Sequence, residues 1–153
     1  MNLDEALESG RVMRYHAAPI DKKQSVAEHT WGVMVILHKL CNPSPELLTH
    51  ALFHDVAELH TGDVPAPVKK SSQLVKDTFD ALETRALHTM GITLPHLTDG
   101  EKRYLKIADC LEGMMYCESR IKAGDLNAID VRDRYVTYLA GLDFNIGDID
   151  VSQ

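Results

Sequence analysis

Amphipathic helical patterns, bounded by capping signals, recur along the chain. In residues 25–41, SVAEHTWGVMVILHKLC, Ser25 is followed three positions later by Glu28, which is the pattern of a capping box, and Pro43 follows the last apolar residue. Between these signals apolar residues recur at spacings of three and four, as on the buried face of an α-helix. The pattern predicts a helix over residues 25–41 with one face in the core.

Further segments carry similar signals. The expected helices cover residues 2–10, 25–41, 45–57, 72–90, 98–123 and 126–140, whereas residues 61–70, TGDVPAPVKK, are expected to form a loop because of their Gly and Pro content. No segment predicts a strand with any clarity, and the tail 144–153 is expected to be irregular. The sequence therefore predicts an all-α fold of about six helices.

Length and composition set outer bounds on this fold. The 153 residues fit one domain, 1–153, with a single sizeable core. No apolar run approaches the roughly 18 residues of a membrane span, and the N-terminal sequence MNLDEALESGRVMRYH lacks the apolar stretch of a secretory signal, so the chain is expected to begin near Met1. The net charge of −7 argues against a nucleic-acid polymer as partner but allows a small anionic substrate.

The cysteines indicate a reducing compartment. Cys41, Cys110 and Cys117 form no CxxC motif and are odd in number. If Cys110 and Cys117 share a helix, their sulfurs lie about 10 Å apart, too far for a disulfide. We expect buried free thiols and a cytoplasmic protein.

Ionisable residues interrupt the apolar face of the third expected helix. Residues 51–65, ALFHDVAELHTGDVP, place His54, Asp55 and Glu58 at helical spacing beside Ala51. Such groups are costly to bury without partners. A divalent metal is one suitable partner, because neutral imidazole and carboxylate both donate to it.

Two other residues could contribute to the same site. His29 lies on the apolar stripe of residues 25–41, and Asp109 lies within KIADCLEGMMYCESR on a face shared with Glu112. Taken singly, His29 is explained as a hydrogen-bonded core histidine, Asp109 as a solvated or capping acid, and Glu58 as a solvated acid at a helix end. Only their combination points to a site.

The order His29, His54-Asp55, Asp109 resembles the H…HD…D signature of the HD-domain phosphohydrolases. The segments AEHTW, HDVAELHTGDVPAPVK and KIADCLE resemble those of the bacterial 5′-deoxynucleotidases and of phage-encoded deoxynucleoside triphosphohydrolases. The likeness covers residues 11–120, which implies a single HD-domain bundle with its motifs in that core and a C-terminal helix and tail in residues 125–153.

The resemblance implies a metal centre and a catalytic acid. The metal ligands would be His29, His54, Asp55 and Asp109, and this mixed nitrogen and oxygen set suits Mn, Co, Fe or Zn. Glu58 matches the family's catalytic glutamate, which would orient water or shuttle a proton.

The resemblance also implies a nucleotide pocket. Asp63 matches an aspartate near the water and the sugar, Arg14 would bind phosphate, Tyr15 would pack on the sugar, and Lys69 could reach a phosphate tail. The remaining loop residues expected to line the pocket are Val64, Pro65 and Ala66. The bacterial nucleotidases carry Trp where this chain has Tyr15, whose hydroxyl needs a partner.

The expected function is hydrolysis of the 5′ phosphoester of a deoxynucleoside monophosphate by a metal-dependent enzyme. One alternative is a triphosphohydrolase that converts a deoxynucleoside triphosphate to deoxynucleoside and triphosphate, and a further one is a nucleotide-binding HD module without turnover. We expect a homo-oligomer in the cytoplasm of a bacterium or a phage-infected host, with a small nucleotide as ligand and no membrane partner.

Overall fold

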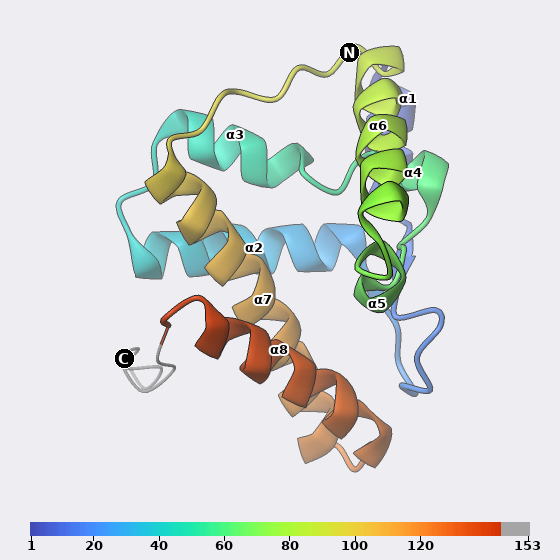
Figure 1. Cartoon of the computed structure of the whole chain (residues 1–153), viewed down its shortest axis with the longest axis vertical. Coiled ribbons are helices and arrows are strands. Elements are labelled where there is room, and N and C mark those ends of the chain that lie inside the picture. Colours follow the sequence, from blue (N-terminus) through green and yellow to red (C-terminus); the bar gives the residue numbers. More distant parts are fainter. Residues whose placement is uncertain (145–153) are drawn as a thin grey trace.

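The computed structural model describes residues 1–144 and confirms the all-α fold class (Figure 1). The expected helices form as α1 (Leu3–Ser9), α2 (Val26–Leu40), α3 (Pro45–Phe53), α6 (Gln73–Thr89), α7 (Asp99–Lys122) and α8 (Ile129–Gly141). Most of the tail expected to be irregular, residues 145–153, lies outside the described residues.

Local capping sets where the two helices with capping boxes begin. At the start of α2, the backbone N–H of Glu28 donates to Oγ of Ser25 at 3.2 Å, and the backbone N–H of Ser25 donates to the Glu28 carboxylate at 2.8 Å. Thr98 and Glu101 form the same reciprocal pair before α7. Each pair satisfies backbone donors that the first turn leaves free, which stabilises a helix by about 1 kcal/mol.

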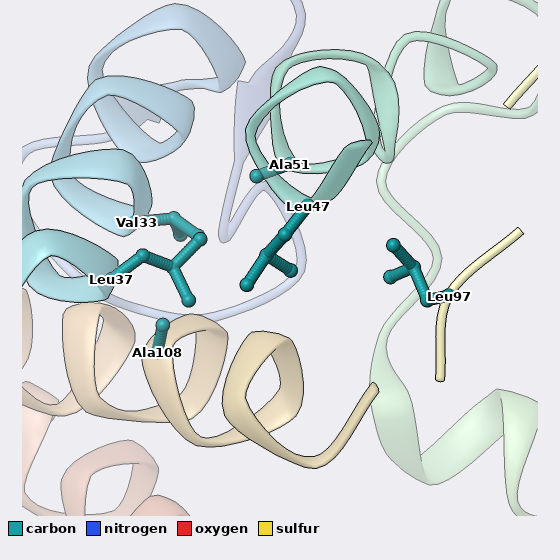
Figure 2. Packing of buried hydrophobic residues seen from close by; sticks show 6 residues of the cluster. All are labelled: Val33, Leu37, Leu47, Ala51, Leu97 and Ala108. Carbon is teal, nitrogen blue, oxygen red and sulfur yellow. The ribbon is translucent and has the colours of Figure 1, made fainter. Parts of the chain in front are cut away.

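Two of the buried clusters join the long helices (Figures 1 and 2). Figure 2 shows the first, in which α2, α3 and α7 meet; its members are Val33, Leu37, Leu47, Ala51, Leu97 and Ala108. The second joins α7 to α8 and contains Ile107, Leu111, Met114 and Leu139. Burying each large apolar side chain contributes roughly 1.5–3 kcal/mol. Because α7 contributes to both clusters, it is the central element that fixes α2 and α8 relative to one another.

The third helix is shorter than expected. It ends at Phe53, residues 54–57 form turns, and the single-turn helix α4 (Glu58–Thr61) follows. The reason is that Val56 packs with Met90 and Ile92, in a different cluster from the one that contains Ala51. The turn at the His-Asp pair lets the two ends of this segment pack in different clusters.

Three small elements, one helical turn and two short strands, were not expected from the sequence. Within the expected loop, Ala66–Lys69 form one helical turn, α5, which begins after Pro65 because proline is compatible with the start of a helix. The strands β1 (Met13–Arg14) and β2 (Gln24–Ser25) pair antiparallel, with Arg14 opposite Gln24. Strands of two residues are too short to show an alternating pattern.

The structure also tests the expectations for the last helix, the cysteines and membrane spans. A 3₁₀ turn, η1 (Leu126–Ala128), precedes α8. Cys110 and Cys117 are buried free thiols, as expected, and Cys41 is also free. Within residues 1–144 no helix is both long enough and apolar enough to cross a membrane.

Candidate metal and substrate site

The imidazoles of His29 and His54 are both held through Nδ1. Nδ1 of His29 bonds to the carboxylate of Glu112, and Nδ1 of His54 lies 2.6 Å from the backbone carbonyl of Ala51. An ionised carboxylate and a carbonyl can only accept, so Nδ1 carries the proton in each neutral ring and Nε2 presents a lone pair. Among residues 1–144 neither Nε2 atom has a hydrogen-bond partner, although both are buried.

Two carboxylates face these nitrogen atoms. Nε2 of His29 lies 3.3 Å from Oδ1 of Asp109 and 3.6 Å from Oδ2 of Asp55, and Nε2 of His54 lies 3.4 Å from Oδ1 of Asp55. Ligand atoms from His29, His54 and Asp55 all lie within 4.8 Å of one another. Lone pairs and negative oxygens directed at the same point repel unless a cation lies between them. The donor set and its orphaned nitrogens therefore fit a divalent metal.

Asp109 divides its two oxygens between different partners. Oδ1 faces His29, whereas Oδ2 accepts a hydrogen bond from Nζ of Lys106, one turn earlier on α7, at 2.6 Å. Burial opposes the charged ammonium, but the Asp109 carboxylate outweighs it and raises the pKa of Lys106 above its ordinary value. Lys106 therefore stays charged and holds Asp109 in place, which leaves one oxygen for an ion.

Arg14 is buried and contacts Glu112, the residue that also bonds to His29. The pairing of β1 with β2 places it next to Gln24, and its Nη1 donates to Oε1 of Gln24 at 3.1 Å. The same nitrogen lies 3.5 Å from Oε2 of Glu112 on α7. A guanidinium fixed in this way is a preformed site for phosphate oxygens.

Glu58 is a buried acid whose carboxyl oxygen Oε2 has no hydrogen-bond partner in residues 1–144. Burial, and then the negative charges of Asp55 and Asp63, raise the pKa of Glu58 to about 9. The side chain is therefore protonated at neutral pH in the absence of an added cation. A protonated carboxyl beside a metal site can act as a general acid.

Tyr15 adopts an unusual backbone conformation. Its φ is 62°, in the left-handed region that side chains other than Gly and Asn rarely adopt, and its backbone N–H donates to Oδ2 of Asp63 at 2.8 Å. Its ring stacks on Tyr116 with centroids 5.5 Å apart, and its hydroxyl pairs with that of Tyr135. The hydroxyl that needed a partner has one, and Asp63 fixes the ring through the backbone.

These groups surround one cavity of about 580 Å³. Every expected site residue except the two histidines lines it. The lining residues are Arg14, Tyr15, Asp55, Glu58, Asp63, Val64, Pro65, Ala66, Lys69 and Asp109. The two histidines lie behind this wall, in contact with Asp55 and Asp109. A more open hollow of about 750 Å³ lies along α8 and contains none of the expected residues, although it shares Lys70, Asp130, Arg134 and Tyr138 with this cavity. The volume of the first cavity, about 580 Å³, suits a nucleotide-sized ligand.

The cavity and its surroundings also include residues that were not predicted as site residues. Tyr135, Arg134 and Lys106 lie on its wall, and Glu112 and Gln24 lie behind His29 and Arg14. Glu112 had a signal, since it is an acid within the apolar run that follows Asp109. Tyr135 had none, because its relation to Tyr15 spans 120 positions. The roles assigned to the expected residues stay predictions, since proximity does not test them.

Comparison with known sequences agrees with the family resemblance described above. A sequence model of the family "5′-deoxynucleotidase YfbR-like" matches residues 10–145. A 5′-deoxynucleotidase of Cronobacter sakazakii is 27% identical over 143 residues, which cover 78% of this chain and 72% of the relative. A 4′-phosphooxetanocin A phosphatase of Priestia megaterium is 30% identical over 103 residues, covering 61% of this chain and 53% of the relative.

Solved structures share the fold. The cyanophage S-2L HD phosphohydrolase DatZ, which was solved with dA and one catalytic Zn²⁺ ion, matches with a TM-score of 0.71 and 19% identity, over 91% of this chain and 82% of that one. A protein of Pyrococcus horikoshii matches with a TM-score of 0.67 and 16% identity, over 97% and 91% of the two chains. At these identities the likeness concerns the fold alone.

Proposed function

Since the chain belongs to the YfbR-like 5′-deoxynucleotidase family, and is therefore a metal-dependent phosphohydrolase, we propose that His29, His54, Asp55 and Asp109 hold its divalent metal beside the nucleotide cavity. The reaction is hydrolysis of the 5′ phosphoester of a deoxynucleoside monophosphate to deoxynucleoside and phosphate. We take the chain as a single HD domain with motifs in residues 11–120 and a C-terminal helix and tail in residues 125–153.

One observation carries the assignment of the metal. Two buried Nε2 atoms with lone pairs, and without partners in residues 1–144, point at two carboxylates on the wall of the cavity that Arg14 enters. A divalent ion at this point would polarise a phosphoryl oxygen and lower the pKa of water. The donors favour Mn, Co, Fe or Zn, and the choice among them is part of the proposal.

The protein's own groups supply the remaining chemistry. Arg14, fixed by Gln24 and Glu112, binds the phosphate oxygens and neutralises their charge. As water attacks phosphorus, the bond from phosphorus to the 5′ oxygen breaks, and Glu58 gives its proton to the leaving oxygen. Glu58 regains a proton from the attacking water, so the reaction closes with no other reactant.

The sugar is expected to lie against Tyr15 and Asp63. Asp63 fixes the backbone of Tyr15, and both line the cavity together with the loop Val64–Ala66. Asp63 has a second oxygen for water or a sugar hydroxyl. We propose that this wall selects deoxyribose by shape.

A deoxynucleoside triphosphate is the second candidate substrate. It is favoured by basic side chains on the cavity wall beyond Arg14, namely Lys69, Lys70, Lys76, Lys106 and Arg134. Three of them are already paired, Lys69 with Glu83, Lys76 with Asp80 and Lys106 with Asp109. This pairing reduces the charge available to a phosphate tail and favours the monophosphate.

One assay tests these assignments together. The protein is reconstituted with each metal in turn, incubated with deoxy- and ribonucleoside mono- and triphosphates, and the released phosphate, pyrophosphate or triphosphate is identified. Phosphate from deoxynucleoside monophosphates supports the proposal. Triphosphate release supports the second candidate, and binding without turnover would indicate a nucleotide-binding module instead.

We further propose that the protein is a homo-oligomer and works in the cytoplasm of a bacterium or an infected host. The free thiols of Cys41, Cys110 and Cys117 support a reducing compartment. Light scattering coupled to gel filtration tests the oligomer; a mass of 17.1 kDa would show a monomer.

A further inference from the structure

We propose that Glu112 is a positioning residue that aligns the His29 imidazole for metal binding and the Arg14 guanidinium for phosphate binding through one buried carboxylate. The inference rests on the proposed function for the roles of His29 and Arg14. It adds a group that lies behind both and that neither the sequence signature nor the cavity lining includes.

The contacts of Glu112 are unusually convergent. Its Oε2 accepts from Nδ1 of His29 and lies 3.5 Å from Nη1 of Arg14, and its Oε1 accepts from Nε2 of Gln24 at 2.6 Å. The three donors come from β1, β2 and α2, while Glu112 lies on α7. One carboxylate therefore ties together the segments that build opposite sides of the site.

The backbone is shaped to admit this carboxylate. Gly32 lies three residues after His29 on α2, and a Cβ at this position would come within 2.6 Å of Cγ of Glu112. Glycine inside a helix costs about 1 kcal/mol relative to alanine. The close approach of Glu112 gives a physical reason for glycine here.

Charge and burial explain what the carboxylate does. Glu112 is 9% exposed and Gln24 is 3% exposed, so the carboxylate needs hydrogen bonds and a counter-charge, which Gln24, His29 and Arg14 supply. In return, the negative charge keeps the proton of His29 on Nδ1 and directs the Nε2 lone pair to the metal.

The same charge orients the guanidinium. Glu112 and Gln24 both engage Nη1 of Arg14, and no hydrogen bond within residues 1–144 engages Nε or Nη2. Arg14 lines the cavity, so its remaining donors are available to a phosphate. Loss of the Glu112 charge should therefore weaken metal binding and substrate binding together, which a residue that acts only on packing would not do.

The experiment uses Glu112→Gln, which keeps the shape and removes the charge, and Glu118→Gln, the same change farther along α7, as the matched control. Co²⁺ affinity is measured by chelator competition, the Co²⁺ site by its visible absorption spectrum, and deoxynucleotide KM and kcat by steady-state kinetics. We expect Glu112→Gln to bind Co²⁺ about 10–100-fold more weakly, with a changed spectrum and a raised KM, and Glu118→Gln to match the wild type.

A second variant tests the same idea if Glu112→Gln folds poorly. Gly32→Ala keeps every polar group but forces the Glu112 side chain to move, while alanine favours the helix. We expect it to alter the Co²⁺ spectrum and weaken Co²⁺ binding. Wild-type Co²⁺ affinity and spectrum in both variants would overturn the inference, as would a Glu112→Gln protein that loses only thermal stability. Absence of turnover in the wild type would instead count against the proposed function, because the Co²⁺ readouts do not depend on it.

Discussion

The hydroxyls of Tyr15 and Tyr135 lie 3.1 Å apart, although 120 positions separate the two residues in the chain. Tyr135 comes from α8 and packs so closely on Gly113 of α7 that a Cβ at this position would overlap its ring. Burial raises the pKa of Tyr135 to about 12, and that of Tyr15 is also raised, so both remain neutral hydroxyls over the physiological range. The pair connects the C-terminal helix to the wall of the cavity.

Replacing either tyrosine of this pair should destabilise the protein. Tyr15→Phe or Tyr135→Phe leaves one hydroxyl without its partner and should lower the free energy of unfolding by about 1 kcal/mol, measured by urea denaturation. The double variant should lose less than the sum of the single losses, because no orphaned hydroxyl remains. Tyr104→Phe, at an exposed position on α7, is the control. Strict additivity would show that the hydroxyls do not interact.

Removal of a metal ligand should abolish both metal binding and turnover. Asp55 faces Nε2 of both histidines, so Asp55→Ala removes the carboxylate that they share. Elemental analysis of the purified variant should find less than a tenth of the wild-type metal content, and phosphate release should fall to background. Asp77→Ala, on the exposed face of α6, should behave as the wild type. Full activity in metal-free Asp55→Ala would show that the ligand set is wrong.

Substitution of Glu58 should separate chemistry from binding. Glu58→Gln keeps the size of the side chain but cannot donate the proton to the leaving oxygen, so kcat should fall by about 10²–10⁴-fold while metal content and nucleotide affinity stay near wild type. Calorimetry and phosphate release on the same preparation provide the measurement. Loss of the metal would make Glu58 a ligand, and unchanged turnover would transfer the catalytic role to Asp63.

The raised pKa of Glu58 should also make the metal-free protein less stable at high pH. Between pH 4.5 and about 9 the folded protein retains a proton on Glu58 that the unfolded chain releases. Raising the pH through this window therefore favours the unfolded state. Urea denaturation in the presence of a chelator at pH 5, 7 and 9 should show this loss, and Glu58→Gln should show a shallower one. Equal slopes would mean that Glu58 ionises normally.

Much of the fold was predictable because its determinants are local. Apolar spacing and the capping pair of Ser25 and Glu28 predicted residues 25–41, and the structure has α2 at Val26–Leu40. The break after Phe53 was not predictable, because it depends on Val56 reaching Met90 and Ile92, which come more than thirty positions later in the chain. Patterns within one helix contain no information about which cluster will bury each end.

In the candidate site, too, some residues could be identified from local sequence and others could not. Four residues were identifiable because polar side chains on apolar helical faces are conspicuous, and because their order along the chain matches the H…HD…D signature of the family. They are His29, His54, Asp55 and Asp109. Glu112 lies on the same helix as Asp109, but its function depends on Gln24 and Arg14, which a two-residue strand pair brings together. Such partners follow from tertiary geometry, which the sequence pattern did not contain.

The burial of His29 also has a consequence for the kinetics of metal exchange. This side chain is fully buried, whereas those of Asp55 and Asp109 are about one-fifth exposed, with both residues on the cavity wall. The exposed side of the proposed metal site therefore faces the cavity in which we propose that the nucleotide binds. A bound deoxynucleoside should then cover the metal, so a chelator should strip the complex more slowly than the free enzyme.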